Sequence, residues 1–193
     1  MMLGIAELFY SIQGEGTWTG VPAVFVRLAG CNLNCRFCDT DYALRAFASV
    51  PQIVTRVREL GGGCPTVILT GGEPLAQTAT SDLIEALRAD GRRVHIESNG
   101  SVAVDLPDDV WLTVSPKERL HPTMAARANE VKLIVDGRVP LEWLDAFSGI
   151  ERPTFLQPEG NKAENVALAL AAAQADPRRL RLGLQMHKYI GVR

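Results

Sequence analysis

Three cysteines lie close together in the first fifth of the chain. Cys31, Cys35 and Cys38 are separated by three and then two residues, whereas the fourth cysteine, Cys64, stands alone. Three thiolates on one short loop can bind three corners of an iron–sulfur cube and leave the fourth iron without a protein ligand. An iron with a free coordination position can bind a substrate, as the open position of a catalytic zinc does. The spacing therefore predicts a [4Fe–4S] cluster that takes part in chemistry.

Two non-catalytic alternatives use the same thiols. A zinc site could take Cys64 or a histidine as its fourth ligand, although zinc ligands usually come as two pairs and the chain has no second pair. An electron carrier normally binds all four irons with protein thiolates, and the chain offers no convincing fourth. Cys64 directly precedes a predicted strand, so we expect it at the opposite end of the fold, as a small buried or surface thiol.

The elements around the cysteine loop alternate between strands and helices. Short apolar runs predict strands at Ala23–Leu28, Thr66–Leu69, Arg93–Glu97, Val110–Val114, Glu130–Val135, Thr154–Gln157 and Arg181–Gln185. Amphipathic runs predict helices at Val50–Leu60, Thr80–Asp90, Leu141–Phe147 and Ala163–Ala175. This alternation is typical of βαβ units and a mostly parallel sheet.

Chain length limits how much of a barrel can form. A complete eight-unit barrel takes about 250 residues. In proportion, a chain of this length holds about six mostly parallel strands, so we expect an incomplete α/β barrel, open on one side. No repeat, linker or low-complexity tract interrupts residues 1–193, which we interpret as a single domain.

Polar or glycine-rich segments follow several predicted strands. They are Gly71-Gly72, Ser98-Asn99-Gly100, Ser115-Pro116-Lys117 and Gln157-Pro158, and the cysteine loop likewise follows Ala23–Leu28. Folds of this kind keep their chemistry at the C-terminal ends of parallel strands. The sequence therefore predicts that these segments meet at one active-site rim.

Composition excludes several classes of protein. The chain is 47% hydrophobic and 22% charged, with a formal net charge of -2, which does not favour a nucleic-acid surface. No apolar run approaches the roughly 18–20 residues of a membrane span, and no signal peptide is evident. Clustered thiols without a secretion signal favour a reducing compartment, and we expect a cytoplasmic protein.

The cysteine spacing, with Phe37 before the last cysteine, resembles that of the radical S-adenosylmethionine superfamily. The segment Thr70-Gly71-Gly72-Glu73-Pro74 is similar to the Gly-Gly-Glu motif of that superfamily. The resemblance implies that the open iron chelates S-adenosylmethionine. It also implies that an electron from the cluster cleaves this cofactor to a 5′-deoxyadenosyl radical, which takes hydrogen from the substrate. In such an enzyme the protein positions and shields the cofactor.

A narrower resemblance covers the whole chain. The segments Glu7–Gly16, Phe25–Leu33, Cys38–Thr40, Ser115–Lys117 and Gln185–Lys188 are similar to motifs of the 7-carboxy-7-deazaguanine synthase family. This implies a carbon–nitrogen lyase of queuosine and 7-deazapurine biosynthesis. Its reaction converts 6-carboxy-5,6,7,8-tetrahydropterin to 7-carboxy-7-deazaguanine with ring contraction and loss of ammonia. The resemblance also implies Mg2+, S-adenosylmethionine that is not consumed, a homodimer, and an electron donor such as a flavodoxin or ferredoxin.

The same resemblance implies roles for individual residues. Substrate contacts are expected at Ile12, Gln13, Gly14, Glu15, Arg27, Thr70, His187 and Arg193. Contacts to S-adenosylmethionine are expected at Arg36, Phe37, Asp39, Gly72, Glu73, Asn99, Ser115, Pro116, Lys117, Gln157, Pro158, Glu159 and Gly160, of which Glu159 and Gly160 match the family pattern poorly. Thr40 is expected to give an oxygen to Mg2+, a cation that prefers oxygen ligands. A guanidinium such as that of Arg27 suits a carboxylate because it presents a planar fork of donors.

Some of these residues have a purely structural alternative. Gln13–Gly16 could be a polar turn, and Glu73 could cap the helix that follows it. Lys117 could be an ordinary solvated lysine. His95 and His121 have no partner at metal-ligand spacing, so no catalytic role is expected for either.

A glycyl-radical-enzyme activase is the alternative radical enzyme. Such an activase shares the cysteine spacing and the small barrel but acts on a protein. The segment Gln13–Gly16 and the position of Arg27 favour a small carboxylated substrate instead.

Overall fold

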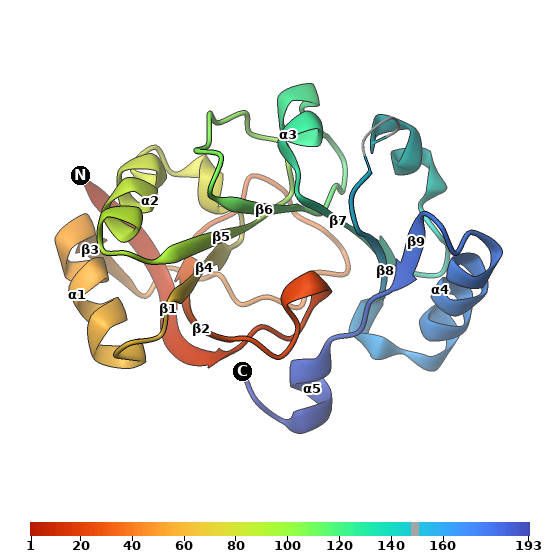
Figure 1. The fold of residues 1–193 in the computed structure, drawn as a ribbon, viewed down its shortest axis with the longest axis horizontal. Helices are drawn as coiled ribbons and strands as arrows, with labels where there is room; N and C mark the ends of the chain where they lie inside the picture. The colour runs from red at the N-terminus through yellow and green to blue at the C-terminus, as the bar shows by residue number, and fades with distance from the viewer. Residues whose placement is uncertain (148–150) are drawn as a thin grey trace.

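The computed structural model of the chain describes residues 1–147 and 151–193. Its framework is one nine-stranded sheet with the strand order β3-β1-β2-β4-β5-β6-β7-β8-β9. The strands are β1 (Met2–Ile12), β2 (Pro22–Leu28), β3 (Ala46–Ser49), β4 (Thr66–Gly71), β5 (Arg93–Ser98), β6 (Trp111–Val114), β7 (Glu130–Val135), β8 (Thr154–Pro158) and β9 (Leu180–Leu182). All pairings from β2 through β4 to β9 are parallel, whereas β1 is antiparallel to both β2 and β3. The sheet curves into an open barrel (Figure 1).

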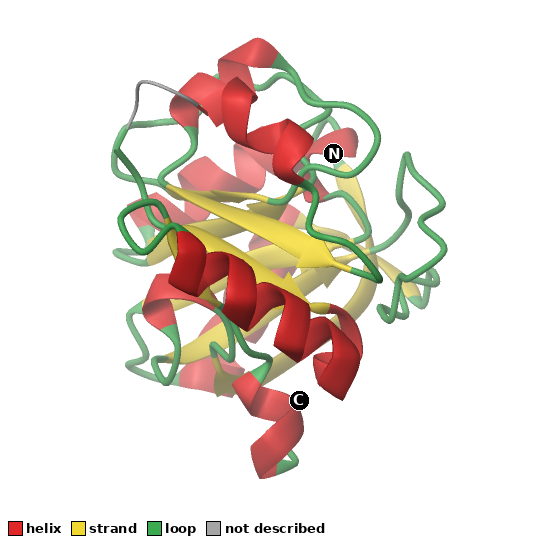
Figure 2. Ribbon diagram, turned by 90° about the vertical axis from the view of Figure 1, so that its right-hand side faces the viewer, coloured by secondary structure: helices red, strands yellow, loops and turns green. Residues whose placement is uncertain are grey.

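Helices cover the outer face of this sheet, as Figures 1 and 2 show. They are α1 (Val50–Gly61), α2 (Thr80–Ala89), α3 (Pro122–Arg127) and α4 (Ala163–Ala175). A further short helix, α5 (Met186–Ile190), lies in the C-terminal tail, away from this outer layer (Figure 1). Short 3-10 helices lie at Gly16–Trp18 (η1), Pro74–Ala76 (η2), Leu141–Phe147 (η3) and Glu159–Asn161 (η4). A capping box between Ser49 and Gln52 starts α1, because each side chain satisfies a backbone group that the helix end leaves open.

The two faces of each strand have opposite character, because successive side chains point to opposite sides. On β7, Val131, Leu133 and Val135 are fully buried against the outer helices. Glu130 and Lys132 alternate with them and face the barrel interior. The hydrophobic core therefore lies between sheet and helices, and the interior of the barrel is left for polar side chains.

The predicted fold class is confirmed: the structure is an open α/β barrel with a mostly parallel sheet. The sheet has nine strands, more than the about six expected from chain length; seven of them were predicted by residue range, and β1 and β3 were not. In β1 the apolar pattern is interrupted by half-buried polar side chains that line the interior, and β3 is a short, largely exposed edge strand. The last predicted strand, Arg181–Gln185, shrinks to β9, and Leu141–Phe147 is a 3-10 helix.

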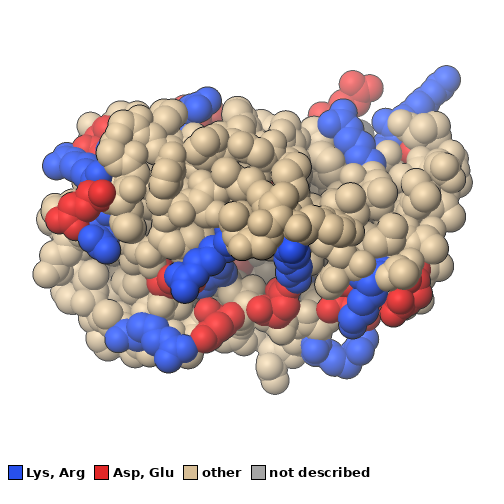
Figure 3. Space-filling model, turned by 90° about the horizontal axis from the view of Figure 1, so that it is seen from below, with Lys and Arg blue, Asp and Glu red and all other residues tan. Residues whose placement is uncertain are grey.

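Charge is mixed on the face that Figure 3 shows, where basic and acidic side chains lie side by side. Within residues 1–147 and 151–193, we find no helix with the length and apolar character needed to cross a bilayer.

Candidate active site

A pocket of about 420 Å³ opens at the C-terminal ends of the parallel strands. It contains most of the side chains predicted from the sequence. They are Ile12, Gln13, Gly14, Glu15, Arg27, Cys31, Cys35, Phe37, Cys38, Asp39, Thr40, Thr70, Gly72, Asn99, Ser115, Lys117, Gln157, Pro158, Glu159, Gly160, His187 and Arg193. The rim expected from the strand ends therefore exists, and it joins the cysteine loop to the N-terminal segment.

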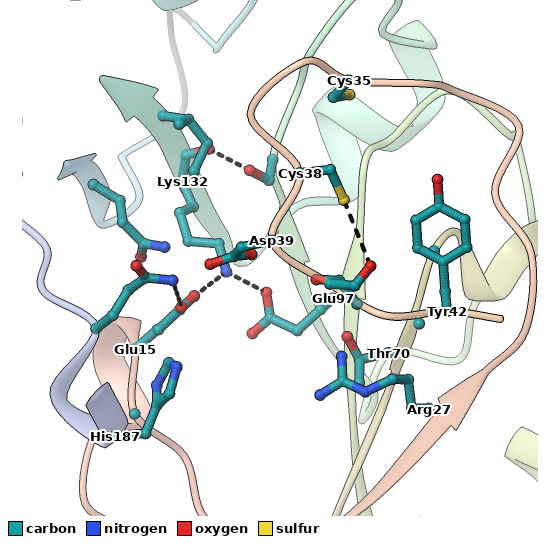
Figure 4. Close-up of a pocket in the computed structure, with 18 of the residues that line it drawn as sticks. Glu15, Arg27, Cys35, Cys38, Asp39, Tyr42, Thr70, Glu97, Lys132 and His187 are labelled. Atoms are coloured by element: carbon teal, nitrogen blue, oxygen red, sulfur yellow. Dashed lines mark hydrogen bonds and ion pairs between the residues drawn. The ribbon is translucent and has the colours of Figure 1, made fainter. Parts of the chain in front are cut away.

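Three thiols line one wall of this pocket. Cys31, Cys35 and Cys38 are unpaired in any disulfide and lie on the loop between β2 and β3, where Cys38 N–H donates to the Cys35 carbonyl at 3.1 Å. Burial raises the pKa of Cys35, and the nearby charge of Lys117 partly offsets this. Figure 4 shows Cys35 and Cys38 above the pocket, with the Cys38 thiol 4.0 Å from the Thr40 carbonyl oxygen.

The donor set fits an iron–sulfur cube better than a single ion. No group of three or more His, Cys, Asp or Glu side chains in residues 1–147 and 151–193 is arranged around one metal position. A cube presents separate iron corners, so three thiolates on one loop need not converge on a single point. Cys64 takes no part, because it is buried ahead of β4, with its sulfur 3.3 Å from the carbonyl oxygen of Pro22 at the start of β2.

The glycine motif packs directly against the cysteine loop. A Cβ atom on Gly72 would lie 2.2 Å from the Gly30 carbonyl oxygen and 2.5 Å from Cys31 Cβ. Gly71 has φ +146° and a similar clash with the Leu28 carbonyl oxygen, so neither position accepts a side chain. The two segments are further joined by a hydrogen bond from Glu73 N–H to the Gly30 carbonyl, at 3.0 Å.

Glu73 lies behind the pocket wall and is fully buried. Its carboxylate accepts hydrogen bonds from Leu75 N–H, Ser98 Oγ and Asn99 N–H at 3.0, 2.9 and 2.7 Å. Burial raises the pKa of Glu73, and these hydrogen bonds partly offset the rise. The Glu73 side chain thus caps η2, which is the structural alternative expected from the sequence. It also links the segment after β4 to the end of β5.

A buried charge network that the sequence did not reveal occupies the centre of the pocket. Lys132 Nζ lies 2.5 Å from Glu15 Oε2 and 2.8 Å from Glu97 Oε2, as Figure 4 shows. Gln13 Nε2 donates to Glu97 at 3.0 Å, and Gln185 Nε2 donates to Glu15 at 3.1 Å. Side chains from β5, from β7, from the β1–β2 connection and from the segment before α5 meet here. The sequence holds one signal for this network. Lys132 and Glu97 are charged residues within predicted strands, in the segments Val-Lys-Leu-Ile-Val and His-Ile-Glu-Ser.

The network shifts the pKa values of Glu15 and Glu97 in opposite directions. Burial acts to raise the pKa of Glu15, but the charge and hydrogen bond of Lys132 outweigh it and lower the pKa to about 2. For Glu97, burial dominates and raises the pKa despite the same lysine. Burial alone would lower the pKa of Lys132, yet the two carboxylates raise it. Lys132 is therefore a fixed cation, and Glu97 is the carboxylate that accepts a proton more readily.

Arg27 lies across the pocket from the cysteines, beside Thr70. The two residues are partners in the β2–β4 register, and Figure 4 shows their side chains together. The guanidinium stacks 5.6 Å above the Phe9 ring, and its Nε is 3.6 Å from Glu7 Oε2. The Arg27 side chain is 22% exposed and lines the pocket. Its guanidinium is therefore only partly paired with Glu7.

Ser115 and Lys117 form the part of the rim next to Phe37. Lys117 Nζ donates to the Ser115 carbonyl at 3.0 Å and lies 5.9 Å from the Phe37 ring centre. Burial lowers the pKa of Lys117 to about 8. The Lys117 side chain is half-buried and lines the pocket, which sets it apart from a lysine surrounded by solvent.

The C-terminal tail closes the side of the barrel between β1 and β9. Met186 N–H donates to the Gly14 carbonyl at 2.8 Å, and Lys188 Nζ pairs with Asp39 at 2.5 Å. His187 packs so closely on Gly14 that a Cβ there would lie 2.2 Å from its Nδ1. At the end of the chain, Arg193 pairs with Glu7.

Three predicted contact residues do not line the pocket: Arg36, Glu73 and Pro116. The Arg36 side chain is 82% exposed and pairs with Asp136. Sequence position alone placed it on the cysteine loop, but the direction of its side chain depends on β7 and the turn that follows.

Comparison with known proteins agrees with this geometry. Residues 26–113 match the family model described as Radical SAM superfamily. The chain is 38% identical to the 7-carboxy-7-deazaguanine synthase of Bacteroides thetaiotaomicron over 100% of both proteins. It is 37% identical to that of Rhodospirillum rubrum over 98% of this chain and 92% of the relative. The chain belongs to the 7-carboxy-7-deazaguanine synthase family.

A solved member has the same fold. The crystal structure of QueE from Escherichia coli superposes with a TM-score of 0.82 at 30% sequence identity, covering 97% of this chain and 95% of the other. As a radical S-adenosylmethionine enzyme of the 7-carboxy-7-deazaguanine synthase family, the chain uses a [4Fe–4S] cluster, S-adenosylmethionine and Mg2+. Cys31, Cys35 and Cys38 are the described thiols placed to hold the cluster.

Proposed function

We propose that this chain converts 6-carboxy-5,6,7,8-tetrahydropterin to 7-carboxy-7-deazaguanine and ammonia, in queuosine and 7-deazapurine biosynthesis. The observation that carries the proposal is full-length similarity to synthases of this name, together with one pocket that joins the cysteine wall to Arg27 and Gln13–Glu15. Bound cluster and S-adenosylmethionine supply the radical that starts the reaction. Loss of ammonia alone makes the conversion redox-neutral, so S-adenosylmethionine need not be consumed.

The substrate side of the pocket is the half opposite the cysteines. A tetrahydropterin carries a carboxylate and an array of ring donors and acceptors. Arg27 and Thr70 suit the carboxylate, and Gln13, Gly14 and Glu15 suit the ring. His187 and Arg193 enclose the same half. Anchoring at both ends would hold the reacting carbon at a fixed place, which is the main contribution a protein makes to radical chemistry.

The cofactor side comprises the glycine motif and the rim. We assign the methionine end of S-adenosylmethionine to Gly72, whose missing side chain permits close backbone approach. The adenosine end would lie along Phe37, Asp39, Asn99, Ser115–Lys117 and Gln157–Gly160, with Glu73 supporting from behind. Arg36 and Pro116 belong to these segments without lining the pocket. Thr40 faces the pocket between the two halves and is our candidate oxygen ligand for Mg2+.

We also propose that residues 1–193 form a single domain and that the protein is a homodimer. We propose further that its electron donor is a protein such as a flavodoxin or ferredoxin. Light scattering of the purified protein tests the dimer, and reduction of the cluster by flavodoxin tests the donor.

The proposed location is the cytoplasm. Four cysteines that form no disulfide support a reducing compartment.

The deciding experiment is turnover after anaerobic cluster reconstitution. The reaction contains 6-carboxytetrahydropterin, S-adenosylmethionine, Mg2+ and a reductant, and mass spectrometry follows 7-carboxy-7-deazaguanine and 5′-deoxyadenosine. We expect the deazaguanine to form in many-fold excess over any S-adenosylmethionine lost. Formation of 5′-deoxyadenosine without that product would show that the substrate is wrong. The absence of both with a loaded cluster would contradict a radical enzyme.

A further inference from the structure

Glu130 is a buried carboxylate below the pocket that has no role in the site described above. It is the first residue of β7, is 2% exposed and does not line the pocket. Within residues 1–147 and 151–193, no ion pair is formed by Glu130. A buried charge without a cation is costly unless hydrogen bonds compensate it. Its hydrogen-bond partners therefore indicate what the side chain does.

The shorter of its two hydrogen bonds comes from the loop that carries the expected substrate contacts, and the other comes from β6. Glu130 Oε2 accepts a hydrogen bond from Thr17 N–H at 2.7 Å, and Oε1 accepts one from Thr113 Oγ1 at 3.4 Å. Thr17 lies in η1, and the first N–H groups of a helix have no partner within the helix. Glu15, the residue before η1, offers no side-chain cap. Glu130 supplies the missing acceptor from a different strand.

The carboxylate also touches the backbone of Gly16. A Cβ at this glycine would lie 2.0 Å from Glu130 Oε1, and Gly16 has φ +67°. Both observations require glycine here. The backbone of the β1–β2 connection at Gly16 therefore packs directly against the Glu130 carboxylate, with no side chain between them.

The rest of the loop is held in the same way. Gln13 N–H donates to the Val21 carbonyl at 2.8 Å and closes the base of the loop. The Trp18 ring packs 4.7 Å from His95 and 5.4 Å from Trp111 and fills the floor of the barrel. The upper side of the same loop carries Gln13, Gly14 and Glu15 into the pocket. Displacing Thr17 would therefore displace the residues expected to contact the pterin.

Strand β7 fixes this loop at two levels. Glu130 holds the loop backbone at Thr17, and Lys132, two residues later on the same face, holds the Glu15 side chain at 2.5 Å. Two contacts from one rigid strand determine both the position and the direction of Glu15. Functional groups need such support, because small displacements from the reactive geometry have large effects on rate.

We propose that Glu130 is a positioning residue, whose carboxylate acts as a hydrogen-bond acceptor that holds residues 13–18 in the geometry that binds the pterin. The identity of the ligand, a pterin, depends on the proposed function, whereas the anchoring of residues 13–18 by Glu130 is independent of that function.

The test compares two variants of Glu130 with a control in the outer core. Glu130→Ala removes the acceptor, and Glu130→Gln keeps an acceptor oxygen without the charge. Ile84→Ala on α2 is the control for a loss of buried side-chain atoms outside the pocket, since Ile84 is 1% exposed and does not line the pocket. Because it removes three buried carbons, its thermal unfolding is measured beside its binding, and Ile84→Val serves as the milder control. Calorimetry on cluster-loaded protein, without reductant, measures the affinity for 6-carboxytetrahydropterin and separately for S-adenosylmethionine.

We expect Glu130→Ala to weaken pterin affinity about tenfold to a hundredfold, with S-adenosylmethionine affinity changed less than about twofold. Glu130→Gln should recover most of the loss, and Ile84→Ala and Ile84→Val should bind both ligands as the wild type does. Equal loss of both affinities in Glu130→Ala would overturn the proposal, as would a Glu130→Gln variant as weak as Glu130→Ala.

Hydrogen exchange gives a readout that needs no ligand. In Glu130→Ala, the amides of residues 13–20 should exchange faster, led by Thr17, while those of β4 and β5 keep their protection. Unchanged exchange at Thr17 would overturn the anchoring role. If the wild type binds no pterin, the proposed function fails, and this exchange measurement still decides the role of Glu130.

Discussion

Lys132 illustrates how one side chain organises the pocket. Its ammonium group lies between two buried carboxylates, Glu15 and Glu97, and its side chain is only 11% exposed. Removing one member of such a buried group leaves an uncompensated charge, which is far more costly than the net value of the pair. The three residues therefore have to be considered together, because the charge of Lys132 limits how far burial raises the pKa of Glu97.

The cysteines differ in what their loss should do. Replacing any one of Cys31, Cys35 or Cys38 with Ala should abolish the cluster and all turnover, because each supplies one corner of the cube. Cys64→Ala should leave both intact, because this thiol lies at the N-terminal end of β4 and contacts only backbone carbonyls in the described structure. Iron content and the visible absorbance of reconstituted protein measure the difference. Loss of iron in Cys64→Ala would mean that the three-ligand site is wrong.

Arg27 should act on one ligand and not the other. Arg27→Ala should weaken pterin binding by about 1.5–3 kcal/mol, the range for hydrogen bonds to a charged group, and no more, because the side chain is partly exposed and already pairs with Glu7. S-adenosylmethionine affinity should be unchanged. Arg56→Ala is the control, since Arg56 is an exposed arginine on α1 paired with Glu59. Equal loss for both ligands in Arg27→Ala would place Arg27 in the scaffold.

At the scale of elements, the connection between β1 and β2 packs against the floor of the barrel and also carries the residues proposed to bind substrate. Trp18 from this connection packs on His95 of β5 and Trp111 of β6, and the Arg93 guanidinium lies 5.6 Å from the Trp18 ring centre. The expectation that His95 is a structural residue agrees with its surroundings. It is 5% exposed and surrounded by aromatic side chains.

This environment predicts a pH dependence of stability. Burial, followed by the charge of Arg93, lowers the pKa of His95 from 6.5 to about 4. Between these values the unfolded chain binds a proton that the folded chain does not. The free energy of unfolding should therefore fall as pH drops from 6.5 to 4, by about 3 kcal/mol at most.

His95→Phe should remove most of this slope, because phenylalanine keeps the aromatic packing without titrating. Urea unfolding at several pH values between 4 and 7 measures it. The pKa of His187 is also lowered by burial, so the comparison is between variant and wild type at each pH. An identical slope in both proteins would show that His95 titrates normally in the fold.

At the scale of the whole molecule, the barrel is open on one side, and the C-terminal tail lies at that side. Edge strands β3 and β9 lie at opposite ends of the sheet order, and α5 lies below the gap in Figure 1. The tail reaches β1 through Ser11 Oγ, which donates to the Arg193 carbonyl at 2.6 Å. The open side is thus covered by a short segment with exposed apolar side chains, Tyr189, Ile190 and Val192.

Deletion of residues 187–193 should leave the fold and the cluster intact, because the tail adds little to the outer core. It should weaken pterin binding about tenfold, since His187 and Arg193 both line that half of the pocket. Calorimetry and thermal unfolding measure the two effects. Arg193→Ala alone should cost less than about twofold, because exposed ion pairs contribute little. Unchanged pterin affinity after the deletion would contradict a role for the tail.

The sequence by itself determined the cofactor chemistry, the fold class and most of the pocket. Cysteine spacing, the glycine motif and polar strand ends are local patterns, and a parallel sheet brings all strand ends to one edge. Helix α4 and strand β7 have the predicted bounds.

Only the tertiary structure decided which buried charges meet. Glu15, Glu97 and Lys132 lie far apart in the chain, and no local pattern in the sequence indicates that they pair with one another. Strand β1 escaped prediction because its inward side chains face a polar pocket instead of an apolar core. The Arg36 side chain lies outside the pocket lining and pairs with Asp136, because spacing locates a residue on a loop but not the direction of its side chain. Direction depends on long-range packing, which sequence patterns do not contain.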